Sequence, residues 1–215
     1  MVTTKKVDQK RELPELYSAA RRPGLVEVPE LAFLMIDGHG DPNRAPEYAQ
    51  AVEAIYTVAY TAKFIVKRSL DGIDVAVMPL EGLWWTPDYS TFTTDDKSAW
   101  DWTMMIAQPE QVTPEVVEQA RAKAAGRKAL AAIDRVRRET FREGRAAQVM
   151  HIGPYAAEGP TIQSLHAFIA ENGYKRAGKH HEIYLRDPRR SAPEKMRTIV
   201  RQPVTPAPTM PAGGA

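Results

Sequence analysis

Aromatic side chains gather in one short window of this sequence. The four tryptophans are Trp84, Trp85, Trp100 and Trp102. Side chains alternate between the two faces of a strand, so Trp100 and Trp102 share a face, whereas Trp84 and Trp85 point to opposite faces. Tryptophans often fill a core, but several on one sheet face beside a glutamate are typical of pocket walls. We therefore assign Trp85, Trp100 and Trp102 to the walls of a binding pocket.

Glu182 is the candidate acid of this pocket. It lies within the strand-like stretch HHEIYL, where Ile183 and Leu185 face one side while Glu182 and Tyr184 face the other. Burial disfavours the charged form of a carboxyl group, so its pKa would rise and it could act as a general acid or base near neutral pH. The same charge could instead bind a lipophilic cation. A solvated strand face is the third interpretation, in which Glu182 has no special role.

Other kinds of site find no support in the residue pattern. The absence of cysteine excludes disulfides, thiol nucleophiles and cysteine-based zinc sites. The adjacent His180 and His181 would point to opposite faces of a strand, and the other three histidines lack a partner at metal-ligand spacing. The sequence has no G-x-S-x-G elbow and no glycine-rich phosphate loop. We therefore expect no metal and no cofactor.

An internal repeat provides the elements that must position these residues. The chain divides near Gly144, and each half shows a strand, an amphipathic helix and two further strands. In the first half these are residues 31–38, a helix from Pro46, 73–85 and 98–107. In the second half they are residues 148–153, a helix after Gly159-Pro160, 179–187 and 195–202. The fold class predicted from this order is α+β, with two pseudo-symmetric βαββ units.

The repeat also pairs two acids. Aligning residues 80–87 with residues 181–188 places Glu81 over Glu182. The pseudo-twofold axis of the fold would then relate the two glutamates, so Glu81 joins Tyr184 and the tryptophans as a candidate ligand-binding residue.

A helical insertion is predicted between the halves, at about residues 112–144. Thr113 is a suitable N-cap, Pro114 fits the first helical position, and Gly144 supplies a stop. Apolar residues at helical spacing, Leu130 and Ile133 among them, suggest that the helix packs on the outside of the domain. A basic helix that binds nucleic acid is less favoured, because acidic residues are interspersed along it.

Length and composition limit the number of domains that the chain can form. With 215 residues, 43% of them hydrophobic, it can bury one sizeable core. We assign residues 1–24 to an N-terminal extension, 25–203 to one domain with halves at about 25–110 and 145–203, and 204–215 to a disordered tail rich in Pro, Ala and Gly.

Charge and hydropathy indicate which classes of binding partner the protein lacks. The 29 basic and 27 acidic residues give a net charge of +2 without a basic run, so no nucleic-acid partner is indicated. No apolar stretch approaches the ~20 residues of a membrane span, and the N-terminus lacks the apolar region of a secretory signal. We expect a cytoplasmic protein with no membrane partner, and the sequence leaves the oligomeric state open.

Five separated motifs resemble the GyrI-like small-molecule-binding family, specifically its stand-alone branch linked to hydrolysis of cyclopropane-bearing, DNA-alkylating natural products. They are LYSAARRPGLVEVPELAFLMIDGHGDPN, VMPLEGLWW, WDWTMMIAQPEQVTPE, HIGPYAAEGPTI and HEIYLRDPRR. The resemblance covers nearly everything from Leu16 to Pro203. It implies the SOUL/GyrI-like α+β fold of two βαββ units, which the repeat indicates independently.

The resemblance also implies roles for particular residues. The characteristic buried acid of the family maps onto Glu182, and the tyrosine that assists it in the hydrolase branch maps, less directly, onto Tyr155 of the HIGPY motif. The implied activity is that of a cyclopropanoid cyclopropyl hydrolase with a lipophilic, aromatic small molecule as substrate.

Two alternatives to an enzyme stay open. One is a noncatalytic binder that sequesters lipophilic, cationic drugs, and the other is a protein-interaction module like the gyrase-inhibitory members. Haem binding, known in SOUL relatives, is the weakest option, because no histidine has a distinctive context.

Overall fold

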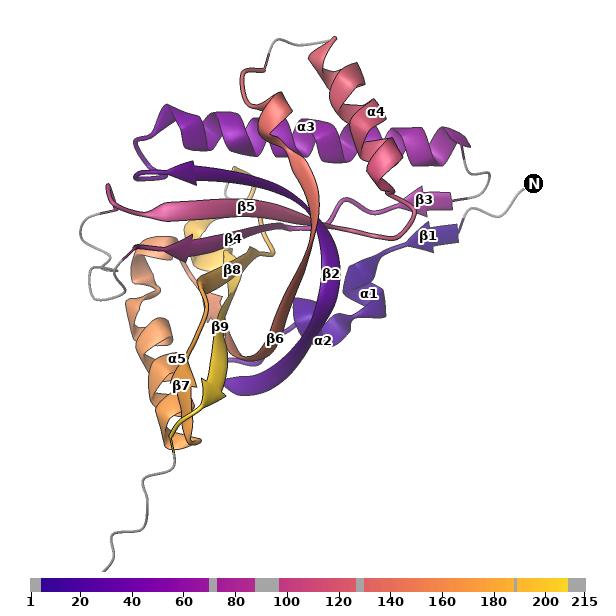
Figure 1. The fold of residues 1–215 in the computed structure, drawn as a ribbon. Coiled ribbons are helices and arrows are strands. Elements are labelled where there is room, and N and C mark those ends of the chain that lie inside the picture. Colours follow the sequence, from indigo (N-terminus) through magenta and orange to yellow (C-terminus); the bar gives the residue numbers. More distant parts are fainter. Residues whose placement is uncertain (1–4, 70–72, 88–96, 127–129, 188, 209–215) are drawn as a thin grey trace, which may run out of the picture.

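Six strands close into a barrel within the part of the chain that the structure describes. The computed structural model covers residues 5–69, 73–87, 97–126, 130–187 and 189–208 (Figure 1). Neighbouring strands follow the order β6-β2-β5-β4-β8-β9, and β9 pairs in turn with β6. The strands are β2 (Gly24–His39), β4 (Leu80–Trp85), β5 (Asp101–Gln108), β6 (Arg137–Ile152), β8 (His180–Tyr184) and β9 (Arg197–Pro206).

The strand order confirms the predicted repeat of two βαββ units. The first unit is β2, α3 (Pro46–Ser69), β4 and β5, with β5 paired between the other two strands. The second is β6, α5 (Gly159–Glu171), β8 and β9, with β9 in the equivalent place. The units join at two antiparallel pairs, β4 with β8 and β2 with β6.

Helices cover the outside of the barrel. The long helix α3 packs against β2 and β5, and α4 (Pro114–Ala125) packs across α3 (Figure 1). The helix α5 lies against β6 and β9, where its Leu165 and Ile169 join Val149 and Val200 in a second, smaller hydrophobic cluster. The short strand β7 (Tyr174–Arg176) extends the sheet beyond β9.

The N-terminal segment belongs to the packed structure. It forms β1 (Lys5–Val7), α1 (Gln9–Glu12) and α2 (Pro14–Tyr17), and β1 pairs in parallel with β3 (Ile73–Val75). Leu16 and Tyr17 of α2 are buried in the main core.

The predicted helical insertion is only partly correct. The helix begins as expected, because Thr113 caps α4 by accepting a hydrogen bond from the backbone N–H of Val116. It ends at Ala125, and after the short 3-10 turn Ile133–Arg135 the chain continues as β6. Residues 137–144 therefore form a strand, because pairing with the long strand β2 outweighs their local helical preference.

The predicted start of the disordered tail, residue 204, is also too early in the chain. Residues 204–206 continue β9, pair with β7, and bury Val204. Pairing with β7 satisfies backbone hydrogen-bonding groups of these residues, and the Pro- and Ala-rich composition gives no sign of this pairing. Residues 209–215, the end of that expected tail, lie outside the described residues.

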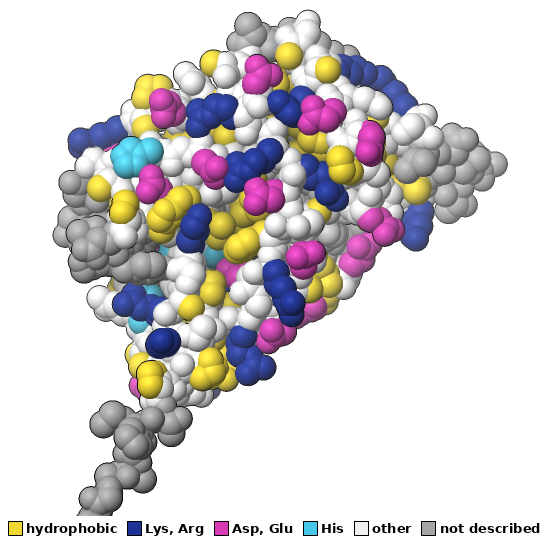
Figure 2. All heavy atoms as spheres, viewed as in Figure 1, with side chains coloured by type: hydrophobic (Ala, Val, Ile, Leu, Met, Phe, Trp, Pro, Cys, Tyr) yellow, Lys and Arg dark blue, Asp and Glu magenta, His cyan; other side chains and the backbone are white. Residues whose placement is uncertain are grey.

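The surface carries both signs of charge. On the face shown in Figure 2, basic and acidic side chains are interspersed over the barrel and its helices. Among the described helices, none combines the length and the apolar composition that a membrane span requires.

Candidate functional site

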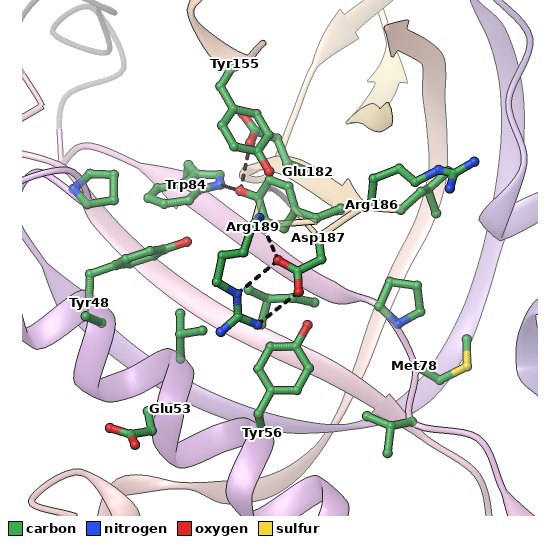
Figure 3. A pocket seen from close by; sticks show the side chains of 18 of the residues that line it. Tyr48, Glu53, Tyr56, Met78, Trp84, Tyr155, Glu182, Arg186, Asp187 and Arg189 are labelled. Atoms are coloured by element: carbon green, nitrogen blue, oxygen red, sulfur yellow. Dashed lines mark hydrogen bonds and ion pairs between the residues drawn. The ribbon is translucent and has the colours of Figure 1, made fainter. Parts of the chain in front are cut away.

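A deep cleft lies on the outer face of the barrel, where the two units meet at β4 and β8. Its volume is about 1640 Å³. The helix α3 forms one wall, residues 155–162 form the other, and β4 and β8 form the floor. In Figure 3, Tyr48 and Tyr56 rise from α3 and Tyr155 points in from the opposite side, with Trp84 and Glu182 between them.

Glu182 lies at the centre of the floor. Its Oε1 accepts a hydrogen bond from His180 Nε2 at 3.2 Å, and its Oε2 accepts one from the Tyr184 hydroxyl at 2.8 Å. Burial opposes ionisation, but these two donors outweigh it and lower the pKa of Glu182. The raised pKa expected from the sequence is therefore wrong, because two neighbours on the same strand face stabilise the carboxylate.

A chain of hydrogen bonds fixes the floor around this carboxylate. Trp84 Nε1 donates to the Tyr184 hydroxyl at 3.1 Å, and that hydroxyl donates onward to Glu182. Burial and the charge of Glu182 raise the pKa of Tyr184 well above its ordinary value, so the hydroxyl stays protonated. The chain links β4 to β8 across the junction of the two units and holds the Glu182 carboxylate in one orientation.

Glu158 is a second carboxyl group in the cleft. It precedes α5 and is only 5% exposed. Burial, followed by the negative charge of Glu182, raises the pKa of Glu158 to about 9. Glu182 and Glu158 therefore differ at pH 7, the first a carboxylate and the second a neutral carboxylic acid.

Aromatic rings surround the two carboxyl groups. The ring of Trp84 lies 5.6 Å from Trp100 and 6.0 Å from Tyr48, measured between centroids. Tyr155 packs edge-on against Tyr184 at 5.5 Å and is 38% exposed. These rings give the cleft flat apolar walls that suit an aromatic ligand.

Two of the expected ligand-binding tryptophans do not line the cleft. Trp85 lies on the opposite face of β4, with the Lys179 ammonium 3.2 Å from its ring centroid, and Trp84 takes the place expected for it. Trp102 shares the correct face but is fully buried under Tyr48, whose ring lies 5.3 Å away. Of the three expected wall residues, Trp100 contributes to the lining.

Glu81 does not line the cleft either. Directly paired residues of antiparallel strands share a face, and Glu81 pairs with Ile183, whereas Glu182 pairs with Gly82. The two glutamates therefore point to opposite faces of the sheet. A twofold axis that relates β4 to β8 can only exchange residues whose side chains lie on the same face of the sheet. The expected equivalence of Glu81 and Glu182 is therefore wrong by one residue.

Glu81 instead belongs to a buried polar network inside the barrel. His181 donates from Nε2 to Glu81 at 3.0 Å and from Nδ1 to Glu143 at 2.9 Å, and Arg201 also contacts Glu143, at 3.2 Å. The hydroxyl of Tyr17 donates to Glu81 at 3.1 Å. These residues come from four different strands and α2, and strands β6 and β8 are not neighbours, so the side chains meet across the lumen.

Charge balance inside the barrel keeps His181 protonated. Burial alone would lower the pKa of His181, but the charge and hydrogen bond of Glu143 and the hydrogen bond to Glu81 raise it to about 9. Burial likewise opposes ionisation of Glu143, and His181 and Arg201 together outweigh it and lower its pKa. The hydrogen bonds that Glu81 accepts from His181 and Tyr17 satisfy its carboxylate inside the barrel and account for its burial.

Gly144 lies within β6, between two residues whose side chains bond to Arg201. Glu143 and Gln148 are five positions apart, so strict alternation would put them on opposite faces, yet both bond to Arg201. Gly144, which lies between them, has a φ of 76°, a conformation that residues with a Cβ rarely adopt, and the pairing with β2 keeps one register on both sides of it.

Metal chemistry has no candidate among the described side chains. No cluster of three or more histidines and carboxylates has the geometry to hold an ion in this part of the chain. The polar side chains of the cleft include Glu158, Glu182, His180 and several tyrosine hydroxyls.

Several residues of the cleft were not predicted from the sequence. Among them are Tyr48, Trp84, Glu158 and His180. His180 could have been found from its position two residues before Glu182, on the same strand face. Glu158 follows the HIGPY motif closely, but nothing in the local sequence shows that its carboxyl group is buried.

Comparison with known proteins identifies relatives over almost the whole chain. The family model described as GyrI-like small molecule binding domain matches residues 22–204. An uncharacterized conserved protein from Listeria innocua is 42% identical with a TM-score of 0.86, and the alignment covers 93% of this chain and 100% of that one. A Listeria innocua protein described as a hydrolase is 42% identical with a TM-score of 0.84, covering 94% and 100%.

More distant likeness extends to the fold alone. The EcmrR C-terminal domain is 13% identical with a TM-score of 0.54, over 86% of this chain and 98% of that one. The search of curated proteins found no match. The family match and the barrel of two βαββ units agree, and this chain belongs to the GyrI-like small-molecule-binding family.

Proposed function

We propose that this protein hydrolyses lipophilic, aromatic small molecules that carry a cyclopropane ring conjugated to a carbonyl group. The observation that carries the proposal is an ionised carboxylate, Glu182, held in one orientation at the floor of an aromatic cleft. A carboxylate in such a place can bind and polarise a water molecule beside a flat substrate. A closely similar Listeria innocua protein described as a hydrolase is consistent with this reaction class.

The reaction places modest demands on the protein. The rings of Trp84, Trp100 and Tyr48 hold the flat substrate against the floor, and Glu182 orients the water toward the strained ring. Burial, followed by the charge of Glu182, raises the pKa of Tyr155, so its hydroxyl remains a hydrogen-bond donor. Tyr155 stabilises the oxygen on which negative charge develops. Release of ring strain supplies much of the driving force.

Incubation of the purified protein with a cyclopropyl-dienone alkylator tests this function directly. Mass spectrometry should detect addition of one water molecule to the alkylator. Glu182→Gln keeps the size of the side chain but removes the carboxylate, so the rate should fall ~10²–10⁴-fold. Glu47→Gln is the matched control, because Glu47 is an exposed residue of α3 outside the cleft lining, and its rate should match wild type. A Glu182→Gln rate equal to wild type would remove Glu182 from the mechanism.

Noncatalytic binding of lipophilic cations is the second candidate function. It is favoured by one specific arrangement, the negative charge of Glu182 facing the rings of Trp84 and Tyr155 (Figure 3). Carboxylates and ring faces both attract cations in a desolvated site. If this function is correct, wild type turns over no cyclopropyl-dienone. Glu182→Gln would then weaken binding of a lipophilic cation at least tenfold, while binding of a neutral analogue of the same shape would change little.

A further inference from the structure

We propose that Glu158 is the proton donor of this cleft, a carboxylic acid that works as the partner of the Glu182 carboxylate. The inference rests on the proposed hydrolysis and adds a second catalytic residue to it. Glu158 and Glu182 line the same cleft from opposite elements, the start of α5 and the strand β8.

The surroundings of Glu158 differ from those of Glu182 in one decisive respect. Both oxygens of Glu182 receive hydrogen bonds from side chains of its own strand. Only 5% of the surface of Glu158 is exposed. Its Oε1 atom is buried and has no hydrogen-bond partner among the described residues. A buried polar atom without a partner is costly, and a ligand in the cleft can supply the partner.

The neighbours of Glu158 decide its protonation. It faces Glu182 of β8, Thr198 of β9, and Lys97, which precedes β5. Burial and the charge of Glu182 outweigh Lys97 and Thr198 and keep Glu158 neutral at pH 7, with its pKa raised to about 9. Two carboxyl groups whose surroundings push their pKa values apart are the usual basis of an acid and base pair.

The pair balances the proposed reaction. The oxygen of water bonds to a cyclopropane carbon as the ring C–C bond breaks, and one water proton passes to Glu182. The electron pair of the broken bond moves through the conjugated system to the carbonyl oxygen, which takes the proton of Glu158. Transfer of a proton from Glu182 to Glu158 restores the starting state. The sum is addition of one water molecule, with no oxidant or reductant.

Infrared spectroscopy tests the proton on Glu158 without any substrate. At pH 7, the wild-type protein should show the carbonyl stretching band of a buried protonated carboxylic acid. Glu158→Gln should lose that band, whereas the exposed-carboxylate control Glu53→Gln should keep it. Absence of the band from wild type, or its persistence in folded Glu158→Gln, would overturn the inference whatever the turnover measurements show.

Kinetics with the cyclopropyl-dienone test the transfer of that proton. In wild type, kcat/KM should fall as pH rises through about 9, where Glu158 loses its proton. Glu158→Gln should lower kcat ~10²–10⁴-fold and remove this alkaline decline. Glu158→Asp, which keeps an acid, should recover part of the rate and the decline, and circular dichroism confirms that each variant is folded.

The two proposals fail in different ways. If wild type hydrolyses the alkylator and folded Glu158→Gln does so at the same rate with the same alkaline decline, Glu158 is not the proton donor and the hydrolase function stands. If wild type produces no hydrolysed product, the hydrolase function fails, and with it the role of Glu158 as its acid. The infrared band then still decides whether Glu158 carries the proton.

Discussion

Alternation of side chains along one strand decides which tryptophan can touch a ligand. Trp84 and Trp85 are adjacent in β4, so their rings lie on opposite faces of the barrel wall. Trp84 lines the cleft and donates to the Tyr184 hydroxyl, whereas Trp85 lies beneath the Lys179 ammonium on the other face.

We predict that Trp84→Phe weakens binding of a flat lipophilic dye about 3–10-fold. The variant loses ring area and the indole N–H, and an aromatic contact of this kind contributes about 0.5–1.5 kcal/mol beyond area burial. Quenching of the remaining tryptophan fluorescence measures the dissociation constant. Trp85→Phe is the matched control and should bind the dye like wild type. Equal affinity of both variants would place the dye away from Trp84.

At the scale of elements, the cleft depends on how closely α3, β2 and β5 approach one another. Gly38 of β2 is paired with Trp102 of β5, and the Trp102 ring lies across the place that a Cβ of residue 38 would occupy. Trp102 in turn supports Tyr48 of α3, which is a wall of the cleft. The absence of a side chain at residue 38 therefore positions a cleft residue on another element.

Gly38→Ala should destabilise the fold by about 1–3 kcal/mol, because the added methyl group overlaps the Trp102 ring inside a packed core. For a chain of this size the melting temperature should fall by roughly 2–12 °C. Gly24→Ala is the control from the same strand, since a Cβ there meets nothing within 4 Å. Thermal unfolding followed by circular dichroism measures both. A Gly38→Ala protein as stable as Gly24→Ala would show that Trp102 can move without cost.

At the scale of the whole molecule, two buried groups on opposite sides of the barrel wall retain protons in the folded state. His181 belongs to the network in the lumen and Glu158 to the outer cleft, and the pKa of each is raised to about 9. The ordinary values are 6.5 for His181 and 4.5 for Glu158, so both groups release protons when the chain unfolds at pH 7 to 9.

The free energy of unfolding should therefore fall as pH rises from 7 to 8.5. The stabilisation from His181 is complete below pH 6.5 and is lost as pH rises through its folded pKa of about 9. The stabilisation from Glu158, an acid with a raised pKa, is lost between its ordinary pKa of 4.5 and its folded pKa of about 9, a range that includes pH 7 to 8.5. Each proton contributes a slope of about 1.4 kcal/mol per pH unit at most. Urea denaturation at several pH values measures the slope.

Glu158→Gln isolates one of these two protons. Its slope should be about half that of wild type, while Glu53→Gln should keep the full slope. A wild-type protein whose stability does not change between pH 7 and 8.5 would contradict the assignment of both protons.

Local patterns in the sequence were sufficient to predict the order of the main strands and helices. Some signals depend only on neighbouring residues in the sequence, and the structure has a strand or helix at each of them. They are the apolar run before Gly38, the helix starts at Pro46 and Pro114, and the stretch HHEIYL. The internal repeat followed from that order, and the closed barrel of two βαββ units confirms it.

Tertiary contacts decided the remainder, because they depend on residues far apart in the chain. Pairing with β2 made residues 137–144 a strand, and the register of β4 against β8 sent Glu81 into the lumen and left Glu182 in the cleft. A shift of one residue in register changes the face of every side chain, and no local pattern specifies it. Burial likewise determines the charge of each acid, so only the folded chain distinguishes the ionised Glu182 from the protonated Glu158.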